Sequence, residues 1–265
     1  MATVSHCLYC FDALTSHLDD REPMSLKKVE ELWEKYCKDP DNASKKQLPA
    51  LRRLAHDSAS ADSSVSTPSS SSTVSLANST PATSTSSLPA ADPVSSKFPL
   101  FVTWNTLSRS SGHTSLRGCI GTFEAQELSD GLYSYALTSA IEDTRFNPIS
   151  KQELPSLEAA VTLLTDFEDC DDSMDWELGT HGIRISFIDR GRRYGATYLP
   201  DVAPEQGWTK EETLVSLMRK AGWGGRKDKW QDIDLKVVRY QGKKESVQYQ
   251  EYKRWYDWVE ANPDA

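Results

Sequence analysis

The sequence predicts a protein that mixes helices with antiparallel hairpins of strands. Two pairs of β-rich segments are each separated by turn residues, 99–104 with 116–122 and 183–188 with 194–199, and this pattern is typical of hairpins. Three other segments have apolar residues at helical spacing: 7–18, 128–141 and 209–221. The chain therefore combines both kinds of element along its whole length.

Composition limits the class of protein. The chain has 265 residues, enough for one large domain or two modest ones. A formal net charge of −9 makes broad binding to nucleic-acid phosphates unexpected. There is no apolar run long enough for a membrane span. The five cysteines are scattered and the N-terminus lacks a signal peptide, so we expect the cytoplasm or the nucleus.

Residues 57–96 consist mostly of Ser, Thr, Ala and Pro, with few charges and no aromatic residue. Such a segment cannot bury enough apolar surface to offset the entropy of ordering it. We therefore expect a disordered insert within a single domain spanning 1–265. Thr67 and Thr80 precede prolines and are candidate phosphorylation sites; the alternative is a passive tether.

The first predicted helix, at 7–18, contains a C-x-x-C pair. Cys7 and Cys10 follow His6, and these residue types could bind zinc. No second C-x-x-C or paired histidine follows at zinc-finger spacing, so packing in the core is favoured and no metal site is expected.

The segment LRGCIG at 116–121 places a thiol between two glycines and close to a guanidinium group. Gly118 and Gly121 would let a ligand approach Cys119, while Arg117 could lower the pKa of the thiol or hold an anion. Alternatively, Cys119 is a buried position in a strand that bulges at the glycines. The pattern leaves both interpretations open.

The next predicted helix, at 128–141, begins at a Ser129–Asp130 N-cap and ends before Pro148. Its end collects further candidate site residues: Glu142, Asp143, Arg145 and Phe146. The alternative is a local ion pair of Arg145 with one of the two carboxylates.

A strand is predicted at 158–164, before a glycine-flanked histidine. His181 could act as a base or a ligand, or it could form a local hydrogen bond in a turn. The following hairpin has a basic turn at 189–193.

The last part of the chain begins with a helix at 209–221, capped by Thr209 and stopped by Gly222. The basic, tryptophan-containing segment 221–230 could stack nucleobases or simply cover the edge of a core. Closing strands are predicted at 235–240 and 246–252, and a terminal helix at 251–259.

Seven motifs together resemble one known family: YCFDAL at 9–14, PLFVTW at 99–104, LRGCIGTF at 116–123, LTSAIEDTRFNP at 137–148, LLTDFED at 163–169, DWELGTHGIRISF at 175–187 and ATYLPDVAPEQGW at 196–208. The chain is similar to the AMMECR-type proteins, named for the human chromosomal region linked to Alport syndrome, midface hypoplasia and elliptocytosis. The resemblance covers the chain apart from the insert, 23–56 and the last few residues. It implies an α+β fold, with a mainly antiparallel sheet flanked by helices and a smaller packed subdomain.

The resemblance implies little about activity. The LRGCIG signature is regarded as the family's functional site, but no agreed reaction or cofactor comes with it. In prokaryotes the domain is found linked with Memo-like and radical-SAM proteins, which implies a shared pathway of modification chemistry by association only.

Three hypotheses follow. The first is a pocket for a small anionic or nucleotide-like ligand or a protein partner, walled by Arg117, Arg145, Phe146 and Trp104, with N–H groups of Gly118 and Gly121 as donors. The second is an enzyme with Cys119 as nucleophile or carrier, in which Glu142, Asp143 or His181 moves a proton. The third is a nucleic-acid role for 190–193 and 226–229, which the acidic total disfavours.

Overall fold

The computed structural model describes residues 1–40, 97–108 and 113–263. The insert predicted at 57–96 lies outside these residues. The residues Met1–Glu34 and Ser95–Ala265 form one unit, and Lys35–Val94 form another. The sheet and the candidate site belong to the first unit.

Six strands form one sheet in the order β2-β1-β3-β6-β4-β5, and every neighbouring pair is antiparallel. Their bounds are β1 (Lys97–Leu107), β2 (Thr114–Glu127), β3 (Leu157–Asp169), β4 (Gly182–Asp189), β5 (Arg192–Tyr198) and β6 (Lys236–Gln248). The predicted α+β fold with a mainly antiparallel sheet is confirmed. Strands β2 and β5 are the two edges.

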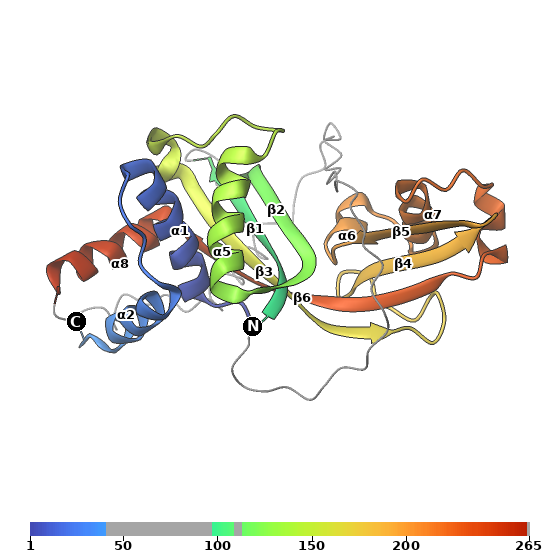
Figure 1. The fold of residues 1–265 in the computed structure, drawn as a ribbon, viewed down its shortest axis with the longest axis horizontal. Helices are drawn as coiled ribbons and strands as arrows, with labels where there is room; N and C mark the ends of the chain where they lie inside the picture. Colours follow the sequence, from blue (N-terminus) through green and yellow to red (C-terminus); the bar gives the residue numbers. More distant parts are fainter. Residues whose placement is uncertain (41–96, 109–112, 264–265) are drawn as a thin grey trace. The chain divides into compact units, whose positions relative to one another are not determined.

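The helices are α1 (Val4–Asp19), α2 (Leu26–Lys38), α5 (Leu128–Leu137), α6 (Val202–Gln206), α7 (Lys210–Lys220) and α8 (Tyr249–Ala261). A π-helical turn, Thr138–Glu142, continues α5, and two 3₁₀ turns span Lys151–Ser156 and Lys227–Asp232. Helices α1 and α5 lie against the strands at the β1 end of the sheet (Figure 1). Within the described ranges, none of the helices is long and apolar enough to cross a membrane.

The core beneath α1 and α5 is built around Trp104. The Trp104 side chain is fully buried, its Nε1 donates to the Ala136 carbonyl at 3.0 Å, and the Phe11 ring packs edge-on to it at 5.1 Å. Cys7 and Cys10 are also fully buried here, as core packing predicts. Trp104 therefore belongs to the core, whereas the binding hypothesis expected it to form a wall of the pocket.

A second core lies between α7 and the β4–β5 end of the sheet. Trp223 and Trp230 are 3% and 4% exposed and belong to it. Their Nε1 groups donate to Asp189 and Glu211. Because both rings are buried, they are not available to stack on nucleobases, and the favoured interpretation, that this segment covers the edge of a core, is confirmed.

The C-terminal boundary also differs from the prediction. A single strand, β6, runs to Gln248, and the residues predicted as a second closing strand at 246–252 mostly form the start of α8. Gln248 caps that helix through a capping box with Glu251, which ends the strand. At α5, Glu127 is the N-cap in place of the predicted Ser129–Asp130, because its carboxylate accepts both of their N–H groups.

Candidate functional site

The LRGCIG segment lies within edge strand β2. Cys119 pairs with Thr103 of β1, and the pairing shifts between Trp104↔Gly118 and Asn105↔Leu116. Arg117 is therefore the extra residue of a bulge, which turns its side chain relative to its neighbours. The bulge was expected at the glycines and lies at Arg117, beside Gly118, while Cys119 itself sits in the regular ladder.

The two glycines of this segment allow close packing within the protein. A Cβ atom at Gly118 would lie 2.1 Å from the Ser139 carbonyl oxygen in the π-helical turn. One at Gly121 would lie 2.3 Å from the Leu100 carbonyl oxygen and 2.4 Å from the Phe101 ring. The space beside both glycines is thus filled by the chain itself, and their side-chain faces do not admit a ligand.

The loop after the π-helical turn clamps the outer edge of β2. Asp143 Oδ2 accepts the backbone N–H of Cys119 at 3.0 Å, and Arg145 Nη2 donates to the Cys119 carbonyl at 3.0 Å. Arg145 also donates to Asp143 through Nε at 2.9 Å and Nη2 at 2.7 Å. The pair satisfies the backbone groups of an edge strand that would otherwise be open.

The surroundings of Cys119 shift the pKa of Asp143 and of the thiol in opposite directions. Hydrogen bonding from Arg145 lowers the pKa of Asp143 to about 2, with help from the Cys119 N–H, so this carboxylate is ionised at neutral pH. Burial raises the pKa of the Cys119 thiol, although the Thr103 hydroxyl, which donates to Sγ at 3.2 Å, and Arg145 act in the opposite direction. The thiol is therefore protonated at neutral pH.

Arg117 is anchored to the 3₁₀ turn that precedes β3. Its Nε donates to Glu153 at 2.8 Å and its Nη2 donates to the other carboxylate oxygen at 3.2 Å. The side chain is only 14% exposed, and Nη1 is buried without a hydrogen-bond partner among the described residues. An unpaired buried donor is rare in native proteins.

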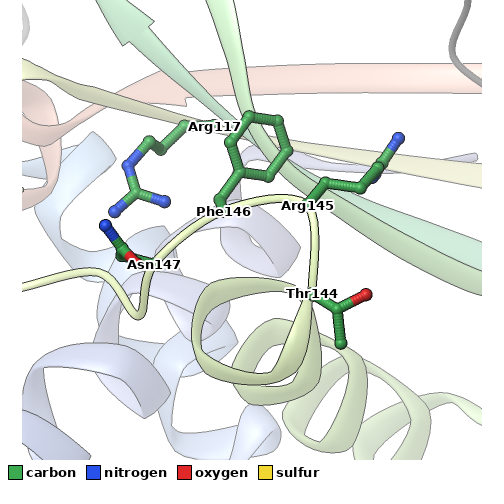
Figure 2. Close-up of a pocket in the computed structure, with 5 residues that line it drawn as sticks. All are labelled: Arg117, Thr144, Arg145, Phe146 and Asn147. Atoms are coloured by element: carbon green, nitrogen blue, oxygen red, sulfur yellow. The ribbon is translucent and has the colours of Figure 1, made fainter.

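These groups line an open pocket of about 440 Å³, formed by Arg117, Thr144, Arg145, Phe146 and Asn147. Figure 2 shows the two guanidinium groups on opposite sides of the Phe146 ring. The Arg117 and Arg145 Cζ atoms are 5.9 and 5.5 Å from the ring centroid, within cation–π range. The pocket thus offers a partly buried aromatic ring between two cations.

The other predicted site residues lie elsewhere. Glu142, at the end of the π-helical turn, is exposed, and it is not among the residues that line the pocket. His181 Nδ1 accepts the Glu177 N–H at 3.0 Å, and His181 lines a separate pocket of about 460 Å³ with Trp176, Lys210 and others. Among the described residues, no three His, Cys, Asp or Glu side chains gather as a metal site would require.

Sequence reasoning missed Glu153 and Thr103, which contact Arg117 and Cys119 directly. Glu153 is 36 positions from Arg117 in the sequence, and no local spacing links them. The capping box that Glu153 forms with Ser150 was readable in the sequence as S-x-x-E. It would have placed a helical turn there, but not its contact with Arg117.

Comparison with known proteins finds one matching family model and several similar sequences. The family model described as AMMECR1 matches residues 7–245. An uncharacterised protein of Arabidopsis thaliana is 48% identical over 58% of this chain and 72% of its own length. One of Saccharomyces cerevisiae is 38% identical over 62% of this chain and 74% of its own. A crystal structure of an uncharacterised Pyrococcus horikoshii protein is 29% identical, covers 58% of this chain and 75% of that one, and superposes with a TM-score of 0.47.

Proposed function

Because this chain belongs to the AMMECR1 family, we propose that its LRGCIG segment and the loop 144–147 form a binding site for a small anionic, nucleotide-like ligand. The observation that carries the proposal is the unpaired Nη1 of Arg117, which has no partner among the described residues, in a pocket that also holds Arg145 and Phe146. Because Nη1 is shielded from solvent, a small movement of the Arg117 side chain towards the pocket would bring this donor to an anionic oxygen. A flat ring of the ligand would stack on Phe146 or on a guanidinium plane.

Charge balance sets the kind of anion that this pocket favours. Arg117 is paired with Glu153, and Arg145 with Asp143, so the pocket has little net positive charge to offer. A ligand with one anionic group and a flat ring fits this balance better than a highly charged one. We therefore expect modest affinity that depends on both the ring and the anion.

The geometry gives less support to thiol chemistry. The Cys119 thiol has a raised pKa, and its sulfur accepts a hydrogen bond from the Thr103 hydroxyl, which is not a base. Asp143 is bound to the backbone of Cys119 and not to its sulfur, and His181 lines another pocket. Within the part of the chain that the structure describes, no base is therefore placed to activate the thiol.

The proposal is tested by NMR titration of the arginine Nε–H signals with AMP and, separately, with inorganic phosphate. AMP should shift the signals of Arg117 and Arg145 saturably, and phosphate should shift them more weakly because it lacks a ring. Arg226 is the internal control, since it also pairs with a carboxylate but is 77% exposed elsewhere. No saturable shift, or equal shifts at Arg226, would overturn the proposal and leave a protein partner as the candidate for this pocket.

A further inference from the structure

The β4–β5 hairpin carries four arginines without an acidic partner among the described residues. Within the described ranges, no ion pair or side-chain hydrogen bond involves any of the four: Arg184, Arg190, Arg192 and Arg193. Five other arginines each pair with a carboxylate: Arg21, Arg117, Arg145, Arg226 and Arg239. In a chain with a formal net charge of −9, this concentration of uncompensated positive charge is a local surface feature.

Several of these charges share one face of the sheet with an exposed apolar side chain. Arg184 and Ile188 alternate with buried residues along β4, so both point to the solvent-facing side. Arg193 lies opposite Ile188, and Lys236 lies opposite Ser186. Ile188 is 62% exposed. The face therefore combines a basic border with one apolar contact.

The hairpin also presents open backbone groups. β5 is an edge strand, and its turn is closed by the pair Asp189↔Arg192. In an antiparallel hairpin with a two-residue turn, the N–H and C=O groups of Arg193, Gly195 and Thr197 then point outward. The Thr197 carbonyl accepts Lys220 Nζ, whereas those of Arg193 and Gly195 have no partner among the described residues.

We propose that this edge binds an acidic, extended segment of a partner protein, which adds to the sheet as a strand beside β5. The strand would receive hydrogen bonds from Arg193 and Gly195, and its carboxylates would pair with the arginines. The nearby Asp189 is occupied by Trp223 Nε1 at 3.1 Å. Asp169 is not a direct neighbour of Arg184, although both lie in one row across the sheet, because Asp169 is on β3 and strand β6 separates it from β4.

Two alternative roles for this basic edge predict different results. Charged side chains on an edge strand can serve only to prevent aggregation, and in that case no peptide binds. A nucleic acid would use the arginines through its phosphates but would have no need of the outward N–H of residue 195. The proposal is independent of the Arg117 pocket, because the two sites share no residue.

The test is fluorescence anisotropy of the full chain with a labelled peptide of alternating glutamate and valine. A lysine–valine peptide and labelled oligodeoxythymidine serve as the matched probes. The double variant Arg184→Glu with Arg193→Glu changes exposed residues only, and Arg226→Glu is its control. Gly195→Pro removes one outward N–H without a ladder bond to β4, and circular dichroism checks that it folds.

We expect the acidic peptide to bind, the double charge reversal to weaken it by about tenfold, and Gly195→Pro to weaken it as well. Arg226→Glu should have little effect. Absence of binding by the acidic peptide overturns the proposal. So does oligodeoxythymidine binding that exceeds peptide binding and is insensitive to Gly195→Pro, a result that would identify a nucleic-acid surface. If Gly195→Pro does not fold, the double charge reversal decides the test by itself. An undiminished affinity of that variant for the acidic peptide then overturns the proposal.

Discussion

Replacing Gly118 by alanine is expected to destabilise the protein by about 3 kcal/mol, because the added methyl group overpacks the contact with the π-helical turn. Its Cβ would lie 2.1 Å from the backbone oxygen of Ser139. Alanine also reduces the freedom of the unfolded chain, which acts in the opposite direction by about 0.4–1 kcal/mol. Denaturant unfolding followed by tryptophan fluorescence measures the net effect.

Gly195→Ala is the matched control, since it is also a strand glycine. A Cβ there would lie 3.5 Å from its nearest neighbour, an ordinary contact, so we expect a change within about 0.5 kcal/mol. If Gly118→Ala is as stable as Gly195→Ala, close packing is not what requires glycine at position 118. A role in admitting a ligand would then be favoured.

Replacing Asp143 by asparagine is expected to cost about 2–3 kcal/mol at neutral pH, because Arg145 and the Cys119 N–H lose a charged acceptor. The Asp143 side chain is 4% exposed, so water cannot easily take its place. Urea unfolding of both proteins measures this difference. Asp228→Asn is the control: it breaks an Arg–Asp pair of equal length, 2.7 Å, whose carboxylate is 59% exposed, and should cost less than about 1 kcal/mol.

The same carboxylate gives stability a defined pH dependence. Its pKa falls from 3.8 to about 2 on folding, so its contribution is fully present above about pH 4 and is lost as the pH falls towards 2. The loss amounts to about 2 kcal/mol. The Asp143→Asn variant should lack this part of the acid sensitivity, and an unchanged pH profile would contradict the assignment of this charge.

Much of the fold is predictable because its signals are local. Thr209 at the N-cap and Gly222 at the end predict helix α7, and the structure has a capping box and a left-handed glycine at these positions. The β4–β5 hairpin follows from its turn, where Arg190 and Gly191 adopt positive φ. Local backbone chemistry of this kind is readable from short stretches of sequence.

Three other elements were missed or misplaced, each for its own reason. Helix α2 was not predicted, although its three buried residues, Leu26, Val29 and Leu32, follow helical spacing. The short helix α6 contains Pro204 and begins just after Pro200, and prolines at this spacing favour a loop. The boundary between β6 and α8 was misplaced, since Val247 and Tyr252 are apolar enough for either structure.

In the candidate site, too, the sequence predicts a local contact and misses the contacts between distant segments. The pair of Asp143 with Arg145 was predicted as the local alternative because two positions separate the residues, and the structure contains it. Its contact with the Cys119 backbone depends on how the loop meets β2, which no sequence pattern specifies. The two glycines suggest openings for a ligand in the sequence, whereas their neighbours Ser139 and Phe101 occupy that space.

We propose that the LRGCIG segment supports a binding pocket through its backbone and Arg117, and that its thiol is not activated. The most direct test is iodoacetamide alkylation of Cys119 as a function of pH, read by mass spectrometry in the native and the denatured protein. We predict that native Cys119 reacts more slowly than in the denatured chain, with a midpoint above about pH 8.5. Faster reaction in the native protein, with a midpoint well below that value, would contradict an unactivated thiol and identify Cys119 as a nucleophile.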